Sequence, residues 1–256
     1  NASVDVLHVL DHHRETASVS DLSGSIGFDA SAELMSKIAE VEAARGKVQI
    51  EKAKSILADA KERLAKDGVS DINLIQRHGS LVETVEEQED GAALVIVGKR
   101  GESADFDKMH LGNNLERVIR ASKIPVLVAS RAFKPIEKFL VAFDGGASAR
   151  KAIDYIVASD LLKGLECHLL MVGRDASSAD RKFSAAKESL SDAGFSVVGE
   201  ILDGDPDEVI GAYVEREGID LVAMGAYGHS KIRQLIVGST TTAMVRTCHV
   251  PVLMFR

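Results

Sequence analysis

The sequence has few cysteines, no long apolar run and no excess of basic charge, and each absence excludes a class of protein. Its 256 residues contain two cysteines, too few for a disulfide framework, so we expect a reducing compartment, the cytoplasm. No apolar run has the length needed to cross a bilayer, so we expect a soluble protein without a membrane partner. The net charge of −8 disfavours nucleic acid as a partner.

Several catalytic and metal-binding patterns are also missing. The two cysteines, Cys167 and Cys248, each precede a histidine, but a zinc site needs four converging ligands. These pairs fall at the starts of different predicted strands, so we interpret them as structural residues and expect no metal site. The sequence contains neither a G-x-S-x-G nucleophile motif nor a G-K-S/T phosphate loop, and no catalytic residue can be assigned.

The two halves of the chain repeat one pattern of short apolar segments. The matching pairs are ALVIVGKRG (93–101) with DLVAMGAYG (220–228), KIPVLVASR (123–131) with HVPVLMFR (249–256), and VDVLHVLD (4–11) with CHLLMVGRD (167–175). Nearly continuous apolar runs of this length are typical of strands that are covered on both faces. The repeat predicts two domains, residues 1–131 and 138–256, joined by a polar linker.

Helical segments separate the predicted strands. They are expected at 31–66, 81–88 and 115–122 in the first half and at 148–161, 179–193, 206–217 and 241–247 in the second. Regular alternation of strand and helix predicts an α/β fold with parallel sheets.

The two halves also differ. The first half has an extra segment at 14–46, which begins as a Ser/Gly-rich loop and continues as an added helix with a kink or break at Gly46. The apolar residues of this helix that share one face are Leu34, Ile38, Val41 and Val48. The second half opens with a strand, a turn and a helix at 137–160 that have no counterpart in the first. A sheet without an interior strand exposes two unpaired edges, so we expect that the sequence lacks the start of the protein.

A glycine and hydroxyl pattern follows the fourth predicted strand of the second half. Its residues are Gly225, Gly228, Gly238, Ser239, Thr240 and Thr241. The free N–H groups at the start of the following helix favour anions, and the hydroxyls donate to phosphate oxygens. Lys231 and Arg233 lie between the glycines, with no acidic residue among them. The pattern predicts a polyphosphate site, and an ordinary turn with a helix cap is the alternative.

An aspartate, Asp144, follows the first predicted strand of the second half and precedes two glycines. In open parallel sheets, ligands bind outside the carboxyl ends of the strands where the winding direction reverses. A carboxylate at that point accepts hydrogen bonds from an adenine amino group or a ribose hydroxyl. The backbone of Val172, at the end of the next strand, would meet a purine edge. The alternative interpretation of Asp144 is a turn that precedes a helix.

Together these motifs resemble the universal stress protein family. The matching pattern is Gly225-x2-Gly228-x9-Gly238-Ser239-Thr240, with Asp144 at a strand end and VPVLMF near residue 256. The resemblance covers nearly the whole chain. It implies two tandem doubly wound five-stranded parallel sheets with strand order 3-2-1-4-5 and helices on both faces, of which the first copy lacks its first strand. It also implies that IPVLVA and VPVLMF pair antiparallel as an internal pseudo-dimer, and a homodimer of the whole chain is a further expectation.

The resemblance further implies that the second domain binds ATP, with or without Mg²⁺, as a sensor or regulator. It implies adenine and ribose contacts at Asp144 and Val172, with Met224 flanking the nucleotide. The residues implied to hold the phosphates are Gly225, Gly228, His229, Gly238, Ser239, Thr240 and Thr241. Two other functions stay open: a slow ATPase or phosphotransfer enzyme, and an interaction module that binds a different small ligand.

The first half departs from this pattern. Its corresponding residues run Gly98-x2-Gly101-x10-Gly112-Asn113-Asn114, with one extra residue and without hydroxyl donors. Acidic residues within this loop also oppose a triphosphate. We therefore predict that the first half binds ATP weakly or not at all.

Overall fold

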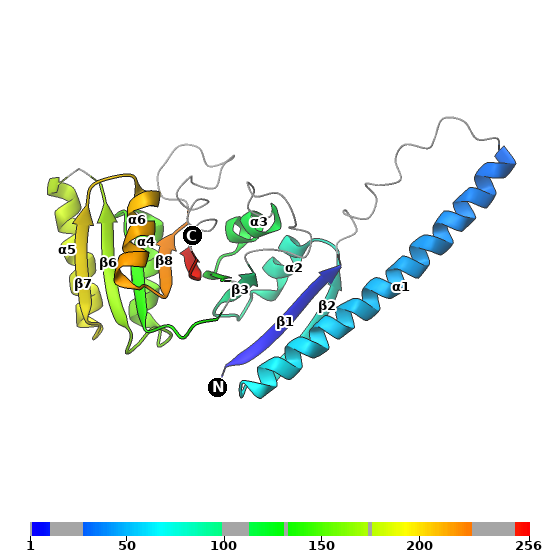
Figure 1. Cartoon of the computed structure of the whole chain (residues 1–256), viewed down its shortest axis with the longest axis horizontal. Helices are drawn as coiled ribbons and strands as arrows, with labels where there is room; N and C mark the ends of the chain where they lie inside the picture. Colours follow the sequence, from blue (N-terminus) through cyan, green and yellow to red (C-terminus); the bar gives the residue numbers. More distant parts are fainter. Residues whose placement is uncertain (1, 11–27, 99–112, 131–132, 174–175, 227–248) are drawn as a thin grey trace. The chain divides into compact units, whose positions relative to one another are not determined.

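The computed structural model describes residues 2–10, 28–98, 113–130, 133–173, 176–226 and 249–256. They form two compact units, residues 1–84 and 85–256. Strands and helices alternate along the chain, which confirms the predicted α/β class (Figure 1). Among the described residues, every helix is too short or too polar to span a membrane.

The first unit contains a two-stranded parallel sheet and a long helix. Strand β1 (Ser3–Leu10) pairs with β2 (Asp71–His78), and α1 (Phe28–Lys66) packs against both strands. On these two strands only Ile75 is buried. The prediction that residues 4–11 form a strand covered on both faces is therefore wrong. Among the described residues of this unit, α1 is the helix that packs on the two-stranded sheet, and most side chains of both strands stay partly or fully exposed.

Helix α1 runs without interruption through Gly46, so the predicted kink or break is wrong. The added helix and the helix that follows it form one element of 39 residues. A single glycine weakens a helix by only about 1 kcal/mol, which the surrounding turns can absorb. Val41 and Val48 are 67% and 68% exposed, so the predicted apolar face is largely uncovered at these positions.

Replacing Gly46 with alanine is expected to stabilise the protein. A methyl group at this position meets no atom within 4 Å, and the backbone is helical. The Gly46→Ala variant should therefore gain about 0.5–1 kcal/mol of unfolding free energy, measured by chemical denaturation. Gly68, beyond the end of α1, has φ +89° and equally open surroundings, so Gly68→Ala should destabilise. Destabilisation by both substitutions would contradict the helical assignment at Gly46.

The second unit is built on a seven-stranded sheet with the order β3-β4-β9-β8-β5-β6-β7. The strands are β3 (Val95–Gly98), β4 (Val126–Ala129), β5 (Lys138–Ala142), β6 (Glu166–Val172), β7 (Val197–Leu202), β8 (Leu221–Gly225) and β9 (Val252–Phe255). The second half contributes β7-β6-β5-β8-β9, which confirms the predicted strand order 3-2-1-4-5. Strands β4 and β9 pair antiparallel, which confirms the predicted pairing between the two copies.

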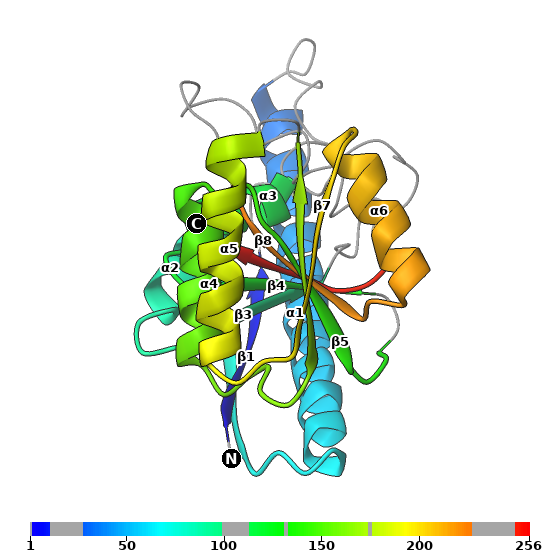
Figure 2. The same cartoon turned by 90° about the vertical axis from the view of Figure 1, so that its left-hand side faces the viewer.

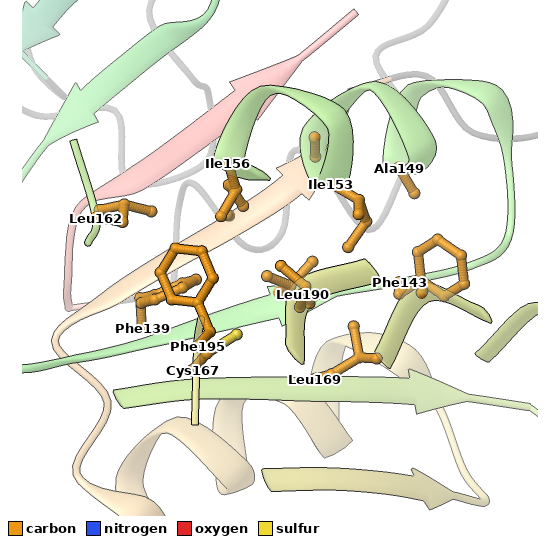
Figure 3. Close-up of a cluster of buried hydrophobic side chains, with 14 of the residues drawn as sticks. Phe139, Phe143, Ala149, Ile153, Ile156, Leu162, Cys167, Leu169, Leu190 and Phe195 are labelled. Atoms are coloured by element: carbon orange, nitrogen blue, oxygen red, sulfur yellow. The ribbon is translucent and has the colours of Figure 1, made fainter. Parts of the chain in front are cut away.

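Helices cover both faces of this sheet. The helices that follow α1 are α2 (Leu81–Gln88), α3 (Asn113–Ala121), α4 (Ala147–Ala158), α5 (Ala176–Asp192) and α6 (Pro206–Glu217). Figure 2 shows α4 and α5 on one face and α6 on the other. Under α4 and α5, Ile153, Ile156 and Leu190 point toward Phe139 and Leu169 of the sheet (Figure 3). Burial of this apolar face is the main force that holds α4 and α5 in place.

Helix α6 has the bounds that the sequence predicts, because both of its ends carry local signals. The Asp205 carboxylate caps the start by accepting from the Asp207 N–H, and Pro206 fits the first helical position. Gly218 ends the helix in the left-handed conformation with φ 65°. The helix predicted at 241–247 lies outside the described residues.

Candidate functional site

The candidate site lies where the winding direction of the second half reverses. From β5 the chain proceeds to β6 and β7 on one side, and β8 and β9 lie on the other side of β5. In the parallel register, Ala142 at the end of β5 is level with Leu170 and with Met224. The residues that follow, Asp144 and Gly225 among them, therefore meet at one edge of the sheet. This is the edge at which open α/β sheets bind ligands.

The carboxylate of Asp144 is exposed at this edge. Its Oδ1 accepts a hydrogen bond of 2.7 Å from the Gly146 N–H, so the turn that precedes α4 is present. Its Oδ2 accepts no hydrogen bond within the described part of the chain. The turn role and a ligand role are therefore compatible, because one oxygen orients the side chain and the other is accessible.

Two glycines allow this turn. Gly145 has φ +71°, a left-handed conformation that other residues rarely adopt. A Cβ atom at Gly146 would lie 2.9 Å from Asp144 Oδ1, so any side chain there would displace the carboxylate. Gly146 is also the N-cap of α4, and no side chain caps this helix start. As far as the described residues show, the first N–H groups of α4 are therefore available to an acceptor.

The end of β8 touches the first turn of α4. A Cβ atom at Gly225 would lie 2.8 Å from the backbone nitrogen of Ala149 and 2.9 Å from Cβ of Ser148. This close packing requires glycine whether or not a ligand is bound. It also brings the chain that leaves β8 directly to the start of α4.

The remaining predicted site residues fall into three groups. Val172 ends β6 half-buried and is followed by Gly173 with φ 151°. Met224 is only 5% exposed and its side chain packs in the core on the α6 face. The residues outside the described part of the chain are Gly228, His229, Gly238, Ser239, Thr240 and Thr241.

The corresponding region of the first half is described at its two ends. Gly98 is the last residue of β3, and α3 begins at Asn113. The glycines between them, Gly101 and Gly112, lie outside the described residues.

Two basic side chains flank the turn at Gly145. The Arg150 guanidinium donates from Nη1 to the Gly145 carbonyl oxygen at 2.7 Å. The Lys182 side chain, from α5, lies across Gly145. Within the described residues, the charged groups that contact this turn are one carboxylate and two cations, a balance that favours an anionic ligand.

A buried polar network near the amino end of β6 has no counterpart among the predicted site residues. His168 is 2% exposed; its Nδ1 lies 2.9 Å from the Tyr213 hydroxyl and its Nε2 lies 2.9 Å from Glu166 Oε1. Burial, with a smaller effect of Glu200, raises the pKa of Tyr213 to about 12. Sequence reasoning missed this network because His168 lies in β6 and Tyr213 lies in α6. Their contact can be recognised only in the folded protein.

Cys167 is a free cysteine in the core, beside this network. Burial raises the pKa of its thiol to about 12. The thiol and the Tyr213 phenol therefore remain protonated at neutral pH and provide neither a nucleophile nor a base. Within the described part of the chain, no three metal-ligating side chains cluster. Cys248 lies outside it.

Comparison with known proteins gives a consistent result. A sequence model of the universal stress protein family matches residues 1–130 and 135–256. Universal stress protein Slr1230 of Synechocystis sp. is 39% identical over 257 residues, which cover 99% of this chain and 90% of that protein. The crystal structure of a universal stress protein from Archaeoglobus fulgidus DSM 4304 is similar in fold, with a TM-score of 0.69 and 24% identity. That similarity covers 99% of this chain and 87% of the other.

Proposed function

The chain belongs to the universal stress protein family, and from this premise we propose that its second half binds ATP as a regulatory ligand. The observation that carries the proposal is the position of Asp144. Its carboxylate stands at the reversal of the sheet, with one oxygen held by Gly146 and the other accessible. A carboxylate in this setting accepts hydrogen bonds from hydroxyl and amino groups, which a nucleoside offers.

The proposal assigns each site residue a role. Asp144 accepts from the ribose or from the adenine amino group, the Val172 backbone meets the purine edge, and Met224 flanks the nucleotide. The phosphates, with or without Mg²⁺, are held by Gly225, Gly228, His229, Gly238, Ser239, Thr240 and Thr241. The close contact of Gly225 with the first turn of α4 supports this assignment, because among the described residues no side chain caps the start of that helix.

A regulatory role is supported by the contacts of α4. This helix starts at the candidate site and also touches the region where the two copies pair. Lys151 donates from Nζ to the Arg256 carbonyl oxygen at 3.0 Å, and the Tyr155 hydroxyl lies 3.4 Å from the Ala93 carbonyl oxygen. A ligand that binds more tightly to one arrangement of α4 shifts the equilibrium toward that arrangement and toward the packing between the copies that goes with it. The size of this shift is set by the difference in ligand affinity between the two arrangements.

The domain assignment follows from the same proposal. Residues 138–256 form the nucleotide-binding domain and residues 1–131 form a degenerate domain that binds ATP weakly or not at all. We further propose that the protein works in the reducing cytoplasm and that whole chains associate as homodimers. Native mass spectrometry of the purified protein tests the ligand directly: one adenine nucleotide per chain supports the proposal, and an adduct of a different mass class contradicts it.

The Asp144→Asn variant is expected to bind ATP roughly 10–100-fold more weakly than the unchanged protein, measured by titration calorimetry. Asparagine keeps the oxygen that accepts from Gly146, so the turn is retained while the charged acceptor is lost. The matched control is Asp192→Asn, which removes an exposed carboxylate at the end of α5, away from the site. Equal affinity in Asp144→Asn and Asp192→Asn would rule out the assigned role of Asp144.

A further inference from the structure

The Lys182 side chain is laid across the turn that carries Asp144. Lys182 lies in the second turn of α5, and helical side chains lean toward the start of their helix. A Cβ atom at Gly145 would lie 2.9 Å from Lys182 Cδ and 3.7 Å from Lys182 Nζ. Gly145 thus provides both the left-handed turn and the space that the lysine occupies. The ammonium group is thereby brought to the edge of the sheet at which the site lies.

Among the residues that the structure describes, no group engages this ammonium group. Lys182 is exposed and, within the described part of the chain, forms no hydrogen bond or ion pair, not even with the nearby Asp144 carboxylate. Arg150, the other cation beside the turn, already donates to the Gly145 carbonyl oxygen. The two cations therefore differ: Arg150 donates to the turn, whereas no group in the described ranges accepts from the three donors of Lys182.

We propose that Lys182 is a further ligand-contacting residue of this site and that its ammonium group binds a phosphate oxygen of the nucleotide. The inference rests on the proposed function. An ammonium group has donors only, so it needs an acceptor, and charged phosphate oxygens are the strongest acceptors that a nucleotide carries. In this arrangement the Asp144 carboxylate accepts hydrogen bonds from the nucleoside, and the Lys182 ammonium group donates to a phosphate oxygen.

This role predicts a specific pattern of affinities. Because Lys182 is exposed, its contribution to the affinity for ATP is moderate and becomes weaker as the salt concentration rises. Because it binds phosphate, it contributes to the affinity for ATP and not to the affinity for adenosine. A lysine that merely packed over Gly145 would affect both ligands alike.

The test uses the full chain with the substitution Lys182→Met, which keeps an unbranched side chain one atom shorter and removes the charge. ATP affinity should fall about three- to tenfold, and adenosine affinity should stay unchanged. The loss should shrink at high salt, and Lys182→Arg should retain most of the affinity. The matched control is Lys187→Met on the same helix, whose side chain lies against Gly199 of β7, with Cδ 3.3 Å from the Cβ position.

The outcomes separate the inference from the proposed function. If the unchanged protein binds ATP and Lys182→Met binds it equally well, the inference is overturned while the proposed function stands. A parallel loss of ATP and adenosine affinity also overturns it, because the effect is then structural. If the unchanged protein binds no ATP, both fall.

Discussion

Replacing Gly225 with alanine is expected to destabilise the protein and to weaken the ATP binding that we propose for its second half. The added methyl group would lie 2.8 Å from the backbone nitrogen of Ala149 and 2.9 Å from Cβ of Ser148. Backbone atoms cannot swing aside as a flexible side chain can, so β8 and α4 must separate. We expect a loss of about 1–3 kcal/mol of unfolding free energy. ATP affinity should fall roughly tenfold or more, because the phosphate segment starts at this contact.

The matched control is Gly211→Ala in α6, where a methyl group meets no atom within 4 Å. The same substitution at Gly211 should raise the free energy of unfolding by up to about 1 kcal/mol, because alanine is the better helix former. Both variants can be compared by chemical denaturation and by calorimetric titration with ATP. Equal stability of the two variants would show that β8 and α4 are not packed as described.

The second large effect is expected at Asp220, a buried carboxylate that anchors the linker between the two halves. Its Oδ1 accepts from Lys134 Nζ at 2.5 Å, and its Oδ2 accepts from the N–H groups of Glu137 and Lys138 at 3.0 and 3.1 Å. Asp220→Ala leaves two backbone donors without their acceptor. We expect a loss of about 2–4 kcal/mol of unfolding free energy. Lys134→Met, which removes only the exposed partner, should cost much less.

The contribution of Asp220 should also depend on pH. Burial by itself raises the pKa of this carboxyl, but the hydrogen bonds from Lys134 and from the Glu137 and Lys138 backbone outweigh it and hold the pKa below its ordinary value. A carboxyl with a lowered pKa in the folded state stabilises fully above its unfolded pKa, about 4, and less as pH falls through the folded pKa. The stability difference between the unchanged protein and Asp220→Ala should therefore narrow in acid. A difference that is constant with pH would contradict the anchoring role.

Much of the fold could be predicted from the sequence because the signals are local or repeated. Helix α6 carries a cap, a first-turn proline and a terminal glycine, so its bounds follow from residues 205–218 alone. The repeat predicts three strands of the second half, β6, β8 and β9, and the apolar run after the linker predicts β5. The course of α1 at Gly46 could not be predicted in this way. A glycine without a neighbouring proline or cap does not indicate whether a helix breaks.

The candidate site could be predicted only in part. The positions of Asp144 and Gly225 at strand ends follow from the apolar pattern. The side chains beside them cannot be predicted in this way, because Lys182 reaches Gly145 from another helix. The exposure of β1 was likewise not predictable, because it depends on which elements pack against its sheet. Sequence analysis interpreted His168 as a structural residue but did not identify its partner Tyr213, because a histidine inside an apolar run does not indicate what it contacts.

The sequence by itself determined the tandem α/β repeat and predicted the sheet edge for a ligand, and its family resemblance implied the order of strands in the second half. Periodicity and turn chemistry act over a few residues, and both can be read along the chain. Tertiary structure alone decided which glycine is sterically required, which lysine lies over the Gly145 turn and which carboxylate anchors the linker. These are contacts between residues distant in sequence, such as Asp220 and Lys134 at a separation of 86, and they form only when the sheet and its helices pack.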